Sequence, residues 1–117
     1  MANSYVTNLY PKPVNGVADR QVTTSSTAGD LFGNGGTTVA AGNSAAFNKL
    51  TRYIVMDVQG ADVRVTFDGS TTPTDSKGHI LFSGRSYTFS KQAAQNLSII
   101  NDSSSLNATI HASEFTD

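Results

Sequence analysis

Residue types that carry catalytic or metal-binding chemistry are scarce in this sequence and widely spaced. There is no cysteine, and only two histidines occur, His79 and His111. Asp68 and Asp75 precede His79 in a stretch rich in turn-forming residues, so one imidazole and two carboxylates could converge on a metal ion or an acid–base pair. Aspartates in such loops serve more often as hydrogen-bonding partners of the backbone. The sequence therefore favours a structural role for them and no metal site.

Other enzyme signatures are missing. The Gly-x-Ser-x-Gly elbow of serine hydrolases does not occur, and the glycine-rich run at 33–36 lacks the Lys-Ser/Thr of a phosphate-binding loop. Glu114 is the only glutamate, so a paired-carboxylate glycosidase would have to use aspartates. Residues 68–70 and 101–103 offer oxygen ligands but not the spacing of a calcium loop. We expect a non-enzymatic protein with no catalytic residues, cofactor or metal.

Aromatic residues are concentrated in the second half of the chain, where they could form a platform for a sugar ring. Three of them, Phe67, Phe82 and Phe89, fall in apolar strand patterns, which favours a place in the core. The sequence therefore predicts core packing for these rings ahead of ligand binding.

Length and charge restrict the class of protein. The chain has 117 residues and a net charge of -1, and its eight basic residues are spread along it, so we expect one domain and no nucleic-acid partner. No apolar run is long enough to cross a bilayer, and the N-terminus lacks a signal-peptide pattern, so we expect no membrane association. Ser, Thr and Asn make up 37 residues, which gives a hydroxyl- and amide-rich surface of low charge.

Two neighbouring stretches give the clearest strand signals. In residues 61–67 apolar and polar side chains alternate, as in a strand with one buried face. Residues 52–58 are β-branched and aromatic, as in a central strand. Because Gln59 and Gly60 lie between them, we expect a tight hairpin there.

The rest of the second half continues in short strands, which predicts an all-β, single-domain β-sandwich of jelly-roll type. Residues 68–78 read as a surface loop. A second hairpin is expected around Ser83 and Gly84, and Ser90 can cap one short helical turn. The expected elements are strands at 79–82, 85–90, 97–100 and 106–113, with the helical turn at 91–95.

The first part of the chain has a different character. Residues 1–28 hold few, scattered apolar side chains, so we expect an extended N-terminal arm or edge segment, followed by the β-sandwich domain at 29–117. Within this part, residues 23–27 fit an edge strand or a linker, and residues 37–41 fit a weak strand.

From about residue 50 to 115 the order of features resembles small structural proteins from the virion gene clusters of tailed bacteriophages. The stretches that carry the resemblance are Val-Arg-Val-Thr-Phe-Asp-Gly-Ser at 63–70, Pro73 with Thr74, Gly-His-Ile-Leu at 78–81, Gly84 with Tyr87, and Ala-Thr-Ile-His-Ala-Ser-Glu-Phe at 108–115. Within that group it is most similar to capsid cement (decoration) proteins. These are small β-sandwiches or jelly rolls, commonly trimeric, on the outside of the head.

The resemblance implies a homotrimer that binds the outer surface of the major capsid protein, made in the bacterial cytoplasm and located on the capsid surface of the virion. On this view apolar residues of the arm anchor it to a partner, with a second contact further along. The implied partner-binding residues are Tyr5, Val6, Leu9, Tyr10, Leu31 and Phe32.

Two alternatives stay open. The arm can instead cover a sheet edge within its own chain, because exposed edges need covering in either case. A tail, neck or head-fibre component with a carbohydrate-binding role would use the same kind of sandwich and the same hydroxyl-rich loops. That alternative predicts exposed aromatic rings near residues 68–78.

Overall fold

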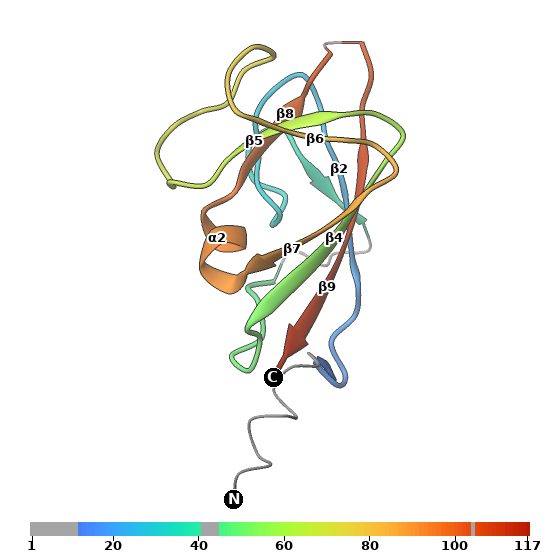
Figure 1. Ribbon diagram of the computed structural model, residues 1–117, viewed down its shortest axis with the longest axis vertical. Coiled ribbons are helices and arrows are strands. Elements are labelled where there is room, and N and C mark those ends of the chain that lie inside the picture. Colours follow the sequence, from blue (N-terminus) through green and yellow to red (C-terminus); the bar gives the residue numbers. More distant parts are fainter. Residues whose placement is uncertain (1–11, 41–44, 104) are drawn as a thin grey trace, which may run out of the picture.

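The chain folds into two antiparallel β-sheets that contribute to one core (Figure 1). The computed structural model describes residues 12–40, 45–103 and 105–117. In these residues strands dominate and one short helix is present, so the all-β prediction is confirmed.

The larger sheet has the strand order β3-β2-β9-β4-β7, and β1 pairs with β9 beside β2. The long strands β9 and β4 form its centre, where Met56 faces Ala112 in the register. The strands are β1 (Lys12–Pro13), β2 (Arg20–Thr23), β3 (Thr38–Val39), β4 (Tyr53–Gln59), β7 (Ser86–Ser90) and β9 (Thr109–Thr116).

The smaller sheet has the order β6-β5-β8, with β6 (His79–Leu81), β5 (Val63–Thr66) and β8 (Ser98–Asn101). The alternation predicted for residues 61–67 is confirmed up to residue 65, since Val63 and Val65 are fully buried and Ala61 is 8% exposed. It breaks at the end of the strand, where Thr66 is buried and Phe67 is half-buried. Inward side chains of both sheets meet in the core. It comprises Val22, Leu31, Phe47, Ile54, Met56, Val58, Ala61, Val63, Val65, Leu81, Ala94, Leu97, Ile99, Ala108, Ile110 and Ala112.

Both predicted hairpins are wrong, because the chain crosses between the sheets at those points. β4 pairs with β7 and β9, whereas β5 pairs with β6 and β8. The turns use the positive φ of Gly60 (88°) and Gly84 (84°). Since a tight hairpin and a sheet-to-sheet turn both need such a glycine, the residue types do not distinguish them.

Residues 20–23, within the arm or edge segment predicted at 1–28, form an inner strand of the larger sheet. β2 lies between β9 and β3, and its inward side chains are Arg20 and Val22, 2% and 0% exposed. One of the two inward positions of β2 thus holds an arginine, which an apolar pattern does not register as a core residue. The arm residues Tyr5, Val6, Leu9 and Tyr10 lie outside the described residues.

Arg20 is held in the core by paired contacts. Its guanidinium donates to the carbonyls of Leu31 (3.0 Å) and Ala45 (2.8 Å) and lies 3.6 Å from Glu114. Its carbon Cζ is 5.0 Å from the ring centre of Phe32 and 4.9 Å from that of Phe47. Desolvation lowers the pKa of Arg20, and the negative charges of Glu114 and Asp30 offset part of this effect because they raise it. The contacts stabilise a buried charge that would otherwise be costly.

The short helix α2 (Lys91–Asn96) begins as predicted. The hydroxyl of Ser90 accepts a hydrogen bond from the backbone N–H of Ala93 at 3.2 Å, which satisfies a donor at the helix start. The fully buried Ala94 and Leu97 anchor the segment to the core. The side chains of Gln95 and Asn96 are left at the surface, next to β8.

Candidate functional site

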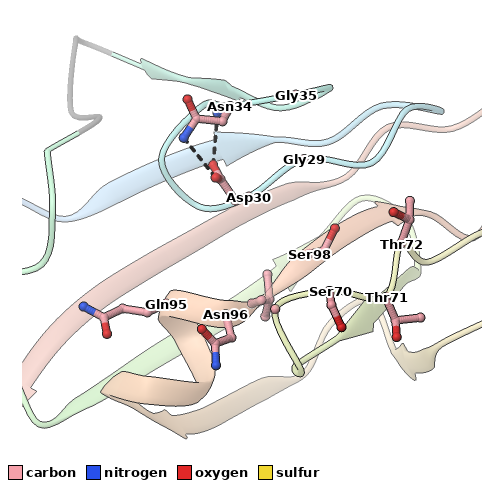
Figure 2. A pocket seen from close by; sticks show the side chains of 12 residues that line it. Gly29, Asp30, Asn34, Gly35, Ser70, Thr71, Thr72, Gln95, Asn96 and Ser98 are labelled. Carbon is pink, nitrogen blue, oxygen red and sulfur yellow. Dashed lines mark hydrogen bonds between the residues drawn. The ribbon is translucent and has the colours of Figure 1, made fainter.

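A polar hollow of about 370 Å³ lies where three segments meet (Figure 2). Residues 29–35 form one side, and residues 69–72 and 95–98 form the other. Its lining is rich in amide and hydroxyl side chains and contains no aromatic ring and no lysine or arginine. The residues are Gly29, Asp30, Asn34, Gly35, Gly69, Ser70, Thr71, Thr72, Gln95, Asn96, Leu97 and Ser98.

The wall at residues 29–35 is fixed around Asp30. Its carboxylate accepts hydrogen bonds from the backbone N–H groups of Phe32 (2.8 Å) and Asn34 (3.0 Å) and from the Asn34 side-chain amide (3.0 Å). Gly29 joins the wall to the smaller sheet through two hydrogen bonds with Ile99, at 2.9 and 2.8 Å. A Cβ at Gly29 would lie 2.5 Å from the backbone nitrogen of Thr37, so only glycine fits there.

The wall at residues 69–72 is fixed by Asp68. Its carboxylate accepts from the backbone N–H groups of Ser70 (3.0 Å) and Thr71 (2.8 Å) and from the Thr71 hydroxyl (2.5 Å). These hydrogen bonds, above all that from the Thr71 side chain, lower the pKa of Asp68 to about 2. In addition, the hydroxyl of Thr66 donates to the Thr71 carbonyl at 2.6 Å. The loop is therefore held in one shape.

We expect the Asp68 carboxyl group to titrate at about pH 2. The pKa of an unfolded aspartate is about 3.9, so the ionised Asp68 carboxylate stabilises the turn fully above about pH 3.9. This stabilisation is lost as the pH falls through about 2. NMR titration of the carboxyl carbon and the Ser70 and Thr71 amides measures the midpoint. Thr71→Val should raise it towards 3.9, and an unchanged midpoint in that variant would contradict the assigned hydrogen bond.

Several polar side chains of the second and third segments have no hydrogen-bonding partner among the described residues. The side chains of Gln95, Asn96 and Ser98 make no hydrogen bond to any of the described residues, and the same holds for the hydroxyls of Ser70 and Thr72. Figure 2 shows the Asn96 and Ser70 side chains across the hollow from Asp30 and Asn34. Free donors and acceptors thus lie on the side of the hollow formed by residues 69–72 and 95–98, facing the Asp30 wall.

A second hollow of about 500 Å³ adjoins the first, since Thr71 lines both. Its lining includes Phe67, Lys77 and His79, and the Phe67 and His79 ring centres are 5.8 Å apart. Within the described residues, no group of three or more His, Cys, Asp or Glu side chains could hold a metal ion. The His79 side chain is exposed beside the loop at 68–78.

The aromatic side chains of this region form a partly exposed row rather than a closed core. Phe67 and Phe89 are 5.0 Å apart between ring centres, and Phe89 and Tyr87 are 6.3 Å apart. Phe67, Tyr87 and Phe89 are half-buried, but Phe82 is 47% exposed, so the prediction of a core position is wrong for Phe82. Its ring instead lies under the Arg85 guanidinium, 5.6 Å from Cζ to the ring centre.

Strand β7, which carries Tyr87 and Phe89 of this row, is an edge strand of the larger sheet among the described residues. The backbone N–H of Lys91 donates to the carbonyl of Arg52, and the carbonyl of Arg85 accepts from the backbone N–H of Val58. The backbone groups of the odd-numbered residues along β7 therefore point to β4. Those of Ser86 and Thr88 point away from it, and no described strand lies on that side. Natural edges are short, charged or interrupted by proline. β7, with the sequence Ser-Tyr-Thr-Phe-Ser, has no charge and no proline and is the longest of the described edge strands.

The two described residues of the predicted partner contact lie near Arg20. Leu31 is fully buried in the core. Phe32 is half-buried, with its ring centre 4.9 Å from that of Phe47. The Leu31 side chain therefore has no surface to offer a partner. No structural feature tests Phe32 as a contact, and it stays a prediction.

No known family model matches the chain, and no curated protein or solved structure is significantly similar to it. None of the described helices is long and apolar enough to span a membrane. The chain's own residues and geometry must therefore support any function assigned to it.

Proposed function

We propose that this chain is a non-enzymatic capsid cement protein of a tailed bacteriophage, which binds the outer surface of the major capsid protein and stabilises the head. The observation that carries the proposal is the uncovered edge of β7 beside the aromatic row. An edge of this kind favours pairing with an extended segment of another protein. The resemblance described above supplies the capsid protein as the partner.

Strand addition at β7 would combine two kinds of interaction. The backbone groups of Ser86 and Thr88 supply main-chain hydrogen bonds to an added strand, each worth about 1 kcal/mol net. The half-buried rings of Tyr87 and Phe89 and the exposed ring of Phe82 supply apolar surface that the added strand would cover. One such contact is weak, but many copies on one shell act together through avidity.

The fold and surface support the same proposal. Two antiparallel sheets with a shared core are compatible with a β-sandwich of jelly-roll type, which the proposal includes. A net charge of -1 and many hydroxyl side chains leave little repulsion between neighbouring copies. The proposal also includes a homotrimer, with the arm residues Tyr5, Val6, Leu9 and Tyr10 reaching a neighbour on the capsid surface.

The test is the location of the chain in purified particles. Heads and tails are separated after disruption, and the chain is quantified by mass spectrometry against the major capsid protein. A fixed stoichiometry with the head fraction supports the proposal. Recovery with tails only, or loss of the chain from washed particles, would overturn it.

The second candidate is a tail, neck or head-fibre component with a carbohydrate-binding role. Two observations favour it: the polar hollow of Figure 2, and the Phe67 and His79 rings beside residues 68–78. Recovery with the tail fraction, together with saturable binding to host polysaccharide, would favour this candidate over the first.

A further inference from the structure

We infer that the polar hollow between residues 29–35, 69–72 and 95–98 is a binding site for a neutral saccharide. The site lies on loops and at the end of α2, apart from the β7 edge proposed to hold the capsid partner. The inference deepens the second candidate function, whose hollow it uses, and does not depend on a place on the head.

The lining has the chemistry that recognises a ring carrying several hydroxyl groups. Each sugar hydroxyl donates one hydrogen bond and accepts others, so it pairs best with amides, hydroxyls and carboxylates. Gln95 and Asn96 supply amide donors and acceptors, Ser98 supplies a hydroxyl, and Asp30 supplies a carboxylate acceptor. A hollow of about 370 Å³ is in the range of small-ligand sites.

Charge selects against an anionic ligand. No lysine or arginine lines the hollow, and the carboxylate of Asp30 forms part of it. Asp68, ionised above about pH 2, holds the adjoining loop. Asp30 is the only charged residue in the lining, so the hollow offers an anionic ligand no pairing cation, and the ligand is a neutral saccharide.

The site is built before a ligand arrives. Asp30 fixes one wall through three hydrogen bonds, and Asp68 fixes the opposite loop through three others. The two hydrogen bonds between Gly29 and Ile99 tie the first wall to β8. Because these groups are already ordered, binding has little loop entropy to overcome.

The neighbouring hollow extends the site for a longer chain. Since Thr71 lines both hollows, a saccharide that occupies the first can continue past Thr71 to the rings of Phe67 and His79. The apolar face of a second or third sugar ring packs well on an aromatic ring. Affinity should therefore rise with chain length, and only the longer ligands should depend on His79.

The experiment is an NMR titration of the full-length, isotope-labelled protein. The probes are D-glucose, D-galactose, D-mannose and N-acetyl-D-glucosamine, a linear trisaccharide of each, and D-glucuronate as the anion. At least one neutral sugar should give saturable shifts at Gly29, Asn34, Ser70 and Asn96, with millimolar affinity. Its trisaccharide should bind at least about fivefold more tightly, and glucuronate at least about tenfold more weakly.

Two variants and a matched control complete the test. The double variant Gln95→Ala/Asn96→Ala should weaken binding at least about tenfold, because it removes both free amides. Gln92→Ala, on the same helix but outside the hollow, should bind as the unchanged protein does. His79→Ala should weaken binding of the trisaccharide alone. Each variant must keep a dispersed amide spectrum, which shows that it is folded.

Three results would overturn the inference. One is the absence of saturable shifts with every probe up to about 100 mM. Another is binding that the double variant leaves unchanged, and the third is a preference for glucuronate. None of them bears on the head fraction of the particle, so failure of the saccharide site and failure of the capsid proposal are distinguishable.

Discussion

Replacing Arg20 by alanine should lower the free energy of unfolding by about 3–5 kcal/mol. The variant leaves the carboxylate of Glu114, 8% exposed, without its cationic partner 3.6 Å away. It also removes the cation between the rings of Phe32 and Phe47 and leaves the Leu31 carbonyl without its donor. Urea unfolding followed by circular dichroism measures the change.

The double variant Arg20→Met/Glu114→Gln is the informative comparison. It removes both charges while keeping most of the volume, so it should be less destabilised than Arg20→Ala. A glutamine can still accept from the Asn48 backbone N–H and the Thr51 hydroxyl, both 2.7 Å from Glu114 in the unchanged protein. Arg85→Ala, which removes an exposed arginine, should cost less than about 1 kcal/mol. Equal losses in Arg20→Ala and Arg85→Ala would contradict the buried-pair assignment.

Replacing Thr88 by proline should lower occupancy of the protein on capsids at least about tenfold. The Thr88 N–H points to the open side of β7, so proline removes a donor that an added strand needs and no bond to β4. Occupancy is measured by adding the purified variant to particles that lack the protein and quantifying the bound fraction after sedimentation.

Thr88→Val is the matched control for this prediction. It keeps the backbone donor and acceptor and changes only an exposed side chain, so its occupancy should stay close to that of the unchanged protein. Both variants must show a cooperative thermal transition. Full occupancy of a folded Thr88→Pro variant would show that the capsid contact does not use the β7 edge.

Local patterns in the sequence predicted individual elements well. The alternation at residues 61–67 predicted β5, and Ser90 predicted the start of α2. Pairing was not predictable in the same way, because the glycines at 60 and 84 serve a hairpin and a sheet-to-sheet turn equally. The role of Arg20 was missed since an arginine in a strand is normally taken to face solvent.

The candidate sites depended on tertiary structure. The hollow of Figure 2 joins three segments, residues 29–35, 69–72 and 95–98, that are far apart in sequence, and each of them alone reads as ordinary turn chemistry. The signal that could have pointed to it was the excess of Ser, Thr and Asn in those loops. The apolar neighbours of Phe82 predict a core position for it, but β6 ends at Leu81, one residue earlier.

The measurement that tests the central claim most directly is electron cryo-microscopy of the purified particle at side-chain resolution. The proposal predicts density for this chain on the outer surface of the head, between capsomers, with a segment of the major capsid protein lying along Ser86–Ser90 as an added strand. A head surface on which this chain has no density would contradict the claim.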